Sequence, residues 1–244
     1  MTRTNRKLDG VRVALTGGTS GLGLALLDEL LARGAHVAFV ARHERRVAEV
    51  AAARANVAGI VGDVADKDDI YPLALQISGL LGGVDVLVNN ASALGPVPLA
   101  LLADTECEDF ESALATNLLG PFRLTRALLG SLSAAARERG GAVVLNVSSD
   151  AAIEAYPRWG AYGASKAGLR HLSRIWDKEL ASQKVRVLSL DPGDMDTPLH
   201  ALAAPGDDPA SLKRPADAAR EFADVIEAAL HALRNPAQLE GAQA

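Results

Sequence analysis

TGGTSGLG, residues 16–23, is the stretch of the sequence that decides the fold. It follows a short apolar run over residues 11–16, and after it leucines recur at helical spacing at positions 22, 26, 27, 30 and 31. The order is therefore strand, glycine-rich turn, helix. Small residues in such a turn allow a sharp bend and let an anion such as a pyrophosphate approach the helix N-terminus. The Gly-x-x-x-Gly-x-Gly spacing differs from the generic dinucleotide fingerprint, so this turn alone leaves a purely structural corner open.

The alternation of strand and helix continues along the chain. Apolar runs predict strands over residues 35–41, 57–61, 84–88, 142–147 and 185–190. Helical spacing predicts helices over 43–54, 66–81 with Asp66 as N-cap, 104–139 with a break near Gly120-Pro121, 162–180 and 216–233. Residues 192–215, rich in Pro and Gly, predict a long loop, and residues 198–214 within it are expected to form a mobile lid.

Strands that alternate with helices imply right-handed crossovers and a parallel sheet covered on both faces. We therefore expect an α/β fold: a three-layer doubly wound parallel sheet, the Rossmann fold, as a single domain over residues 8–234 with short tails at 1–7 and 235–244. In such sheets ligands bind beyond the carboxyl ends of the strands. The loops that follow the strands are where functional residues are expected.

Composition excludes several classes of protein. The 244 residues are 49% hydrophobic, 23% charged and only 4% aromatic, which predicts a globular, soluble chain. A net charge of −5 offers no positive field for nucleic acid or an anionic membrane. Cys107 is the single cysteine, no Cys/His cluster has metal-ligand spacing, and no apolar run suits a signal peptide or a membrane span. We expect a cytoplasmic protein without a metal.

Arg42 directly follows the second predicted strand, about twenty residues past the glycines, where an NAD enzyme usually carries an acid for the ribose hydroxyls. A cation at this position suits a 2′-phosphate. Arg45 and Arg46 add positive charge nearby, although a solvated helix face is the better explanation for these two residues. The pattern favours NADP(H) as the cofactor, with NAD(H) possible.

Tyr162 and Lys166 stand four residues apart at the start of a predicted helix, so their side chains share one face. A nearby ammonium favours the phenolate and brings the tyrosine hydroxyl closer to acid/base chemistry. Ser148 and Ser149 follow the fifth strand, where a hydroxyl can hydrogen-bond a substrate oxygen. Taken alone, the pair also fits a packed Tyr beside a solvated Lys, and the serines also fit caps or turns.

Together these residues resemble the short-chain dehydrogenase/reductase family in its common form of about 250 residues. The resemblance extends from about Leu8 to Leu233. Its motifs occur in the family's order: TGGTSGLG at 16–23, Asp63-Val64, NNAS at 89–92, Asn117, Ser149, YGASK at 162–166 and PGDMDT at 192–197. The resemblance implies an NAD(P)(H)-dependent oxidoreductase that interconverts a carbonyl and a secondary alcohol by hydride transfer, such as a 3-oxoacyl-type or secondary-metabolite ketoreductase.

By the same resemblance, the catalytic tetrad is Asn117, Ser149, Tyr162 and Lys166. Tyr162 acts as general acid in reduction, Ser149 polarises the carbonyl, and Lys166 holds the nicotinamide ribose and lowers the tyrosine pKa. Asn117 supports a water that connects Lys166 to solvent. The implied cofactor contacts, besides Tyr162, Lys166 and Arg42, are Gly17, Thr19, Ser20, Gly21, Leu22, Gly23, Asp63, Val64, Asn90, Ala91, Pro192, Gly193, Met195 and Thr197. A cap, turn or packing role remains the alternative for each of these residues.

The sequence departs from the family pattern at three places. Ser92 replaces a glycine, which costs little if the backbone there has negative φ. Ser20 stands where many NADP(H)-preferring members carry Arg or Lys, so the NADP(H) prediction rests on Arg42. The ending at 235–244 lacks the family's usual last strand, which leaves a homodimer through the long helices and a homotetramer equally open.

The sequence leaves open whether the protein is catalytically active and what its substrate is. A dinucleotide-sensing or scaffold protein that has lost catalysis is the alternative function, and the intact tetrad argues against it. The substrate is set by loops at 93–99, 150–159 and 198–214, where Tyr156 and Trp159 either contact an apolar substrate or pack against neighbouring structure. The sequence chooses neither the substrate nor the direction of reaction.

Overall fold

A computed structural model describes residues 7–235, and within them one sheet of six parallel strands forms the centre. The strand order is β3-β2-β1-β4-β5-β6. The strands are β1 (Arg12–Thr16), β2 (His36–Ala41), β3 (Val57–Val61), β4 (Val86–Asn89), β5 (Ala142–Val147) and β6 (Val185–Leu190). The order reverses between β1 and β4, which confirms the predicted doubly wound sheet in a single α/β domain.

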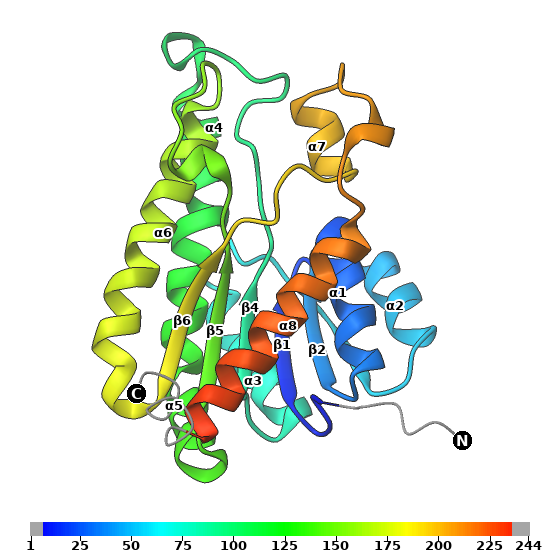
Figure 1. Cartoon of the computed structure of the whole chain (residues 1–244). Coiled ribbons are helices and arrows are strands. Elements are labelled where there is room, and N and C mark those ends of the chain that lie inside the picture. Colours follow the sequence, from blue (N-terminus) through cyan, green and yellow to red (C-terminus); the bar gives the residue numbers. More distant parts are fainter. Residues whose placement is uncertain (1–6, 236–244) are drawn as a thin grey trace, which may run out of the picture.

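Helices cover both faces of the sheet (Figure 1). One face carries α1 (Gly21–Ala32), α2 (Glu44–Ala52) and α8 (Pro215–Arg234). The other carries α3 (Ile70–Leu81), α5 (Gly120–Arg139) and α6 (Gly160–Leu180). Two shorter helices, α4 (Cys107–Leu114) and α7 (Pro198–Ala203), lie beyond the carboxyl ends of the strands. The three predicted layers are present.

Two apolar cores hold the layers together. Along β1, Val13 and Leu15 pack with α1 and α8, whereas Ala14 between them packs with α3 and α5. Because both faces of a parallel strand are buried, each strand reads as an unbroken apolar run. This is the pattern by which the sequence revealed five of the strands to within about one residue, whereas β4 begins two residues after its prediction.

The predicted start of α3 is wrong by four residues. Asp66 is not its N-cap: the helix begins at Ile70, directly after Asp69. The Asp66 carboxylate instead accepts a hydrogen bond of 2.9 Å from the backbone N–H of Asp68. Such local side-chain hydrogen bonds offer the backbone an alternative to the helix, so Asp66 closes a turn and does not cap α3.

Two further expectations need correction. The chain does not break at Gly120-Pro121, because a π-helical turn over Ala115–Leu119 joins α4 to α5. Residues 192–215 are not a structureless loop: they contain α7 and a 3-10 turn at Pro209–Ser211. Pro198 occupies the first turn of α7, where its missing N–H costs nothing, and Thr197 caps that turn. The parts of the predicted tails at 1–6 and 236–244 lie outside the described residues.

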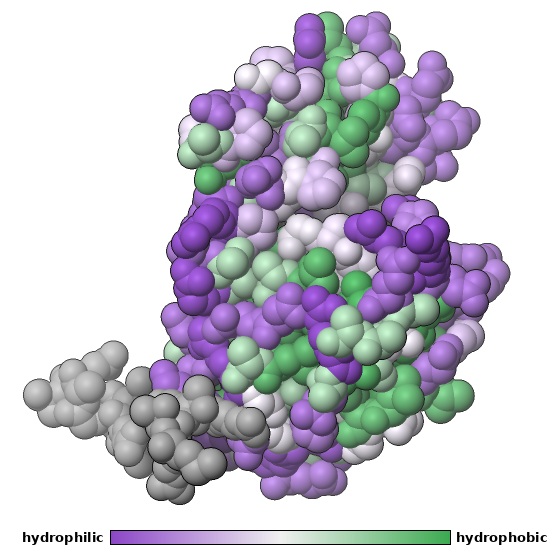
Figure 2. Space-filling view, turned by 90° about the vertical axis from the view of Figure 1, so that its right-hand side faces the viewer, coloured by the Kyte–Doolittle hydropathy of each residue, from purple (hydrophilic) through white to green (hydrophobic). Residues whose placement is uncertain are grey.

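The fold brings the loops after β1, β2, β4, β5 and β6 to one edge of the sheet. Figure 2 shows a hollow on this face, between the upper part of the molecule, which holds α7, and the body formed by the sheet layers. Among the described residues, no helix is both long and apolar enough to cross a membrane. Cys107 is exposed and unpaired.

Candidate active site

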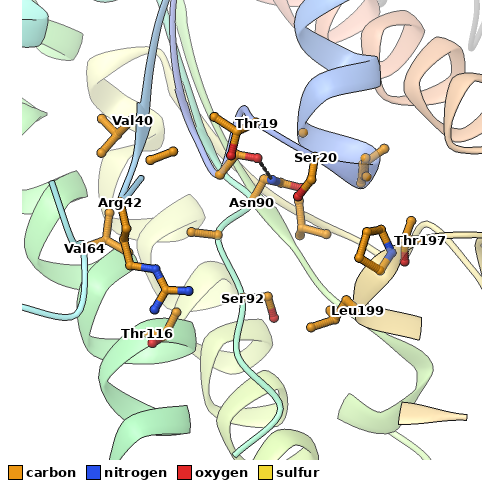
Figure 3. Close-up of a pocket in the computed structure, with 18 of the residues that line it drawn as sticks. Thr19, Ser20, Val40, Arg42, Val64, Asn90, Ser92, Thr116, Thr197 and Leu199 are labelled. Carbon is orange, nitrogen blue, oxygen red and sulfur yellow. Dashed lines mark hydrogen bonds between the residues drawn. The ribbon is translucent and has the colours of Figure 1, made fainter. Parts of the chain in front are cut away.

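A first cavity of about 360 Å³ opens at the carboxyl ends of β1, β2 and β4. Figure 3 shows its side chains converging from the first glycine turn, the end of β2 and the loop after β4. Of the residues predicted to contact a cofactor, only Gly193 does not line it. Positions that are distant in sequence therefore meet around one space.

The glycine turn forms one wall of the first cavity. Gly17 and Gly21 have positive φ values of 75° and 50°, which L side chains rarely adopt. Gly23 has no room for a side chain, because a Cβ there would collide with the Gly17 carbonyl oxygen and with the Asn90 amide. Ser20 precedes α1 without a side-chain cap bond, so the N–H groups of the first turn remain available to an anion.

Asn90 fixes the glycine turn from the neighbouring strand. Its amide donates to the carbonyls of Thr16 at 2.9 Å and Gly17 at 3.2 Å. In return, the Thr16 hydroxyl accepts from the backbone N–H groups of Asn90 and Ala91, both at 3.0 Å. Asn90 thus shapes the cavity wall by packing and hydrogen bonding, which is the alternative that the sequence left open.

Arg42 is the cation that lines the far end of the cavity. Its side chain is exposed and has no ion-pair partner among the described residues, and Figure 3 shows the guanidinium extending into the cavity. Arg45 instead pairs with Glu49 at 2.8 Å on the exposed face of α2. Neither Arg45 nor Arg46 lines the cavity, so for these two the solvated-face interpretation holds.

Tyr162 and Lys166 sit on the first turns of α6 and are both buried, with 7% and 2% of their surface exposed. Tyr162 lines the first cavity and also a second one, whereas Lys166 lines only the first. The Lys166 ammonium donates to the Val147 carbonyl at 2.8 Å and lies 5.5 Å from the centre of the Tyr162 ring. The predicted pair therefore faces the cavity from one side of the helix.

Burial dominates the protonation of this pair. It raises the pKa of Tyr162 to about 12, and the neighbouring hydroxyls of Ser149 and Ser92 offset part of this rise. Burial also lowers the pKa of Lys166 to about 8. The predicted lowering of the tyrosine pKa by Lys166 does not appear in this geometry. At neutral pH Tyr162 holds its proton, which suits a proton donor.

Ser149 begins the 3-10 turn at Asp150–Ala152, and its hydroxyl accepts from the Ala151 N–H at 3.2 Å. The same hydroxyl donates to the Asp150 carboxylate at 2.9 Å. Ser149 lines the second cavity together with Tyr162. It thus serves as a turn cap and also faces the space next to the tyrosine.

Asn117 lies in the π-helical turn and is fully buried. Its amide donates to the Ala93 carbonyl at 2.7 Å and to the Ser165 hydroxyl at 2.8 Å. Its oxygen accepts from the Ala93 N–H at 2.8 Å and from the Ser92 hydroxyl at 3.2 Å. Asn117 lines neither cavity, so its side chain ties the loop after β4 to α6.

The second cavity, of about 300 Å³, adjoins the first at Tyr162. All three loops named in the sequence contribute to its walls, and so does the segment from Asp191 to Thr197. Tyr156, Trp159 and Gly193 are among the lining residues. Trp159 packs edge-on against Tyr162 with ring centres 5.6 Å apart. Both interpretations of Trp159 therefore apply, because the ring packs on the helix and also faces the cavity.

Some lining residues were not singled out from the sequence. In the first cavity these include Val40, Gly62 and Thr116, and in the second Asp191 and His200. Strand ends could have indicated Val40 and Gly62, since both lie at the carboxyl edge. His200 lies in the loop 198–214 that the sequence named as a substrate wall, but no motif marks this histidine, and it is α7 that brings it to the cavity.

Comparison with known proteins identifies the family of the chain. A family model described as short chain dehydrogenase matches residues 12–207. A 3-oxoacyl-[acyl-carrier-protein] reductase of Thermotoga maritima is 32% identical over 197 residues, which cover 79% of this chain and 77% of that protein.

Solved structures of similar proteins have the same fold. The 3-ketoacyl-(acyl-carrier-protein) reductase of Brucella melitensis, complexed with NADH, superposes with a TM-score of 0.83 at 26% identity, covering 90% of this chain and 91% of that one. A short chain dehydrogenase of Escherichia coli CFT073, complexed with NADPH, gives 0.82 at 25%, with the same coverage. The chain therefore belongs to the short-chain dehydrogenase family, whose members are oxidoreductases that use a nicotinamide dinucleotide.

Proposed function

We propose that this enzyme is an NADP(H)-dependent ketoreductase in which Tyr162 transfers the proton between a carbonyl and a secondary alcohol. The observation that carries the proposal is that Tyr162 lines both cavities. A proton-donating hydroxyl at the junction of a cofactor space and a substrate space is what carbonyl reduction requires. The 3-oxoacyl reductases named above support ketone reduction as the reaction class.

The residues of the first cavity fit a dinucleotide. The uncapped N-terminus of α1 suits a pyrophosphate, and the space beside Gly17 and Gly23 exists only because these positions lack a Cβ. Arg42 supports the preference for NADP(H), since its free guanidinium can take a 2′-phosphate in bidentate fashion. Asp63 and Val64 would face the adenine, and the segment from Pro192 to Thr197 would face the nicotinamide carboxamide.

In the proposed reaction the nicotinamide supplies the hydride to the carbonyl carbon. The Tyr162 hydroxyl donates its proton to the carbonyl oxygen as negative charge develops there. The Ser149 hydroxyl polarises the same oxygen, for which its proton has to turn away from Asp150. Lys166 uses one N–H on the Val147 carbonyl, which leaves two for the ribose hydroxyls.

Asn117 is proposed as a positioning residue. Its side chain uses all of its hydrogen bonds on Ser92, Ala93 and Ser165, so a water that links Lys166 to solvent would have to use its main-chain carbonyl. The π-helical turn around Asn117 supports this role, because a widened turn leaves carbonyls without their usual helical partners.

A titration with NADPH and with NADH, followed by a panel of ketones monitored at the nicotinamide absorbance, tests the proposal. We expect tighter binding of NADPH and turnover of at least one ketone. Tyr162→Phe should lower turnover by about 10³-fold, because the proton donor is lost, while nucleotide affinity stays close to that of the wild type. Nucleotide binding without turnover of any ketone would favour the sensing or scaffold alternative, and no binding of either nucleotide would reject both.

The assembly and location of the protein complete the proposal. We propose a homodimer or homotetramer through the long helices α5 and α6. The single cysteine, Cys107, has no partner for an internal disulfide, which supports a cytoplasmic location. Sedimentation of the purified protein distinguishes monomer, dimer and tetramer.

A further inference from the structure

The second cavity carries an unusual charge. Its lining holds four aspartates and one histidine, and among the described residues no Lys or Arg lines it. The aspartates are Asp150, Asp191, Asp194 and Asp207. The first cavity, by contrast, has Arg42 and Lys166 in its wall. The two spaces that meet at Tyr162 therefore differ in the sign of the charge around them.

Asp150 lies closest to the proposed chemistry, directly after Ser149. Its carboxylate accepts from the Ser149 hydroxyl at 2.9 Å, from the Ala151 N–H at 2.7 Å and from the Tyr156 hydroxyl at 2.8 Å. Although burial disfavours its charge, the hydrogen bonds from Tyr156 and Ser149 lower the pKa of Asp150 below its usual range. Asp150 is thus a fixed negative charge at the mouth of the catalytic site.

Asp191 and Asp194 extend this negative charge along the loop after β6. Asp191 accepts a bond of 2.9 Å from the Gly193 N–H, and neither side chain forms an ion pair with a Lys or Arg among the described residues, although the Asp191 charge acts on the buried Lys166 ammonium. Asp207 pairs with His200 at 2.8 Å, and Asp194 lies 3.8 Å from the other nitrogen of the same ring. The lining therefore contains one histidine and several carboxylates, so it stays negatively charged even when the histidine is protonated.

Ser148 provides a second, independent sign that a polar ligand belongs here. The residue is 5% exposed and lines both cavities, and its hydroxyl has no hydrogen-bond partner within the described structure. Buried polar groups almost always have a hydrogen-bond partner, so a polar atom of a bound ligand can supply the partner that this hydroxyl lacks. Together with the Tyr156 hydroxyl, it adds polar contacts to a space whose apolar walls include Leu94 and Trp159.

We propose that the second cavity selects a carbonyl compound that carries a positively charged nitrogen, with Asp150, Asp191 and Asp194 as its specificity-determining residues. The inference rests on the proposed ketoreductase function and narrows its substrate class. A cation in this cavity gains from several carboxylates at once, and Tyr156 and Trp159 add aromatic faces that attract ammonium groups. A carboxylate or phosphate on the substrate would meet repulsion from the same residues.

Three matched methyl ketones test this charge selection. They carry a trimethylammonium, a hydroxyl or a carboxylate group at the same distance from the carbonyl. In low-salt buffer with saturating NADPH, we expect kcat/KM to fall at least about tenfold from the cationic to the neutral ketone, and further for the anionic one. Raising the salt concentration should narrow these ratios, because screening weakens charge recognition.

Two variants and a control locate the effect. Asp150→Asn and Asp194→Asn each remove one charge with little change of shape, and should lower kcat/KM for the cationic ketone about tenfold, mainly through KM. The neutral ketone should change much less with Asp194→Asn. Asp104→Asn is the matched control, since this aspartate is exposed and lies outside the linings of both cavities.

Binding can be measured without turnover, which separates this inference from the proposed function. The chain has two tryptophans, and Trp176→Phe leaves Trp159 in the cavity wall as the reporter of ketone binding. If the cationic ketone binds tightest but none is reduced, the charge selection stands and the ketoreductase proposal fails. If the neutral or anionic ketone binds and reacts as well as the cationic one, the charge selection is wrong and the ketoreductase remains.

Discussion

The two cavities that meet at Tyr162 are built in different ways. The first is made of strand ends, a glycine turn and a helix N-terminus, so the backbone itself sets its shape. The second is made of side chains from loops around α7 and the 3-10 turn after β5. If the first cavity holds the cofactor and the second the substrate, as proposed, the fold sets the cofactor space, whereas individual side chains set the substrate space.

The largest effect should come from filling the backbone-built cavity. Gly23→Ala places a Cβ against the Gly17 carbonyl and the Asn90 amide, which cannot move without displacing the turn. We expect a loss of about 2–4 kcal/mol in the free energy of unfolding, and nucleotide affinity lowered by about 100-fold or more. Denaturant unfolding and nucleotide titration measure the two effects.

Gly79→Ala is the matched control for this substitution. Gly79 lies inside α3 with open space where a Cβ would stand. Alanine in a helix interior should raise the free energy of unfolding by about 0.5–1 kcal/mol and leave nucleotide binding unchanged. If Gly23→Ala behaves like the control, the turn does not depend on close backbone approach, and the contrast between the cavities disappears.

In the proposed function the side chain of Arg42, and not the backbone, decides between NADPH and NADH in the first cavity. Arg42→Asp should weaken NADPH by about 30-fold or more and leave NADH nearly unchanged, because only the 2′-phosphate loses a charge-assisted contact. Arg45→Asp makes the same charge change outside the cavity and should have little effect. Equal loss of both nucleotides would remove the proposed phosphate contact.

The sequence predicted the first cavity well for a physical reason. A turn such as 16–23 admits few residue types, since positive φ at Gly17 and the crowding at Gly23 exclude side chains. Buried parallel strands likewise need unbroken apolar runs, so five of the strands were located to within about one residue and β4 to within two.

The second cavity was less predictable because its residues obey no such constraint. Asp191 and His200 reach it through the path of the chain after β6, which includes an α7 that the Pro- and Gly-rich composition concealed. The saturated hydrogen bonds of Asn117 were also invisible, since its partners Ala93 and Ser165 come from two different segments. The rise of the Tyr162 pKa on burial could not be predicted from the sequence either, because it depends on how the folded chain packs around this side chain.

Burial of the Lys166 ammonium in the wall of the first cavity lowers the stability of the fold. Its pKa falls from 10.5 to about 8 on burial, and one unit equals about 1.4 kcal/mol. Lys166→Met removes the buried ammonium and should raise the free energy of unfolding at pH 7 by about 2 kcal/mol, after allowance for the lost bond to the Val147 carbonyl. Activity should be lost at the same time.

The pH dependence of the free energy of unfolding tests whether burial of the Lys166 charge causes this difference in stability. Between pH 8 and 10.5 the unfolded wild type binds more protons at this position than the folded one, so wild-type stability rises with pH across this window. The Lys166→Met variant lacks that rise, and the difference between the two proteins should shrink towards pH 10. A constant difference over the window would show that burial of the charge is not its source.

The smallest effect should come from Ser92, where the chain departs from the family's glycine. Ser92 has no positive φ, and its hydroxyl bonds the Asn117 oxygen, which also accepts from Ala93. Ser92→Ala should therefore lower the free energy of unfolding by less than about 1 kcal/mol. Because the hydroxyl also lowers the pKa of Tyr162, the variant's alcohol oxidation should need a higher pH.

Ser92→Gly separates the hydrogen bond from the backbone. It loses the same bond and adds freedom to the unfolded chain, so it should be less stable than Ser92→Ala by about 0.5–1 kcal/mol. Denaturant unfolding of the two variants side by side gives this difference directly. A glycine variant more stable than Ser92→Ala would show that the backbone at Ser92 is strained. Serine would then lower the stability of the fold at this position, contrary to what its negative φ predicts.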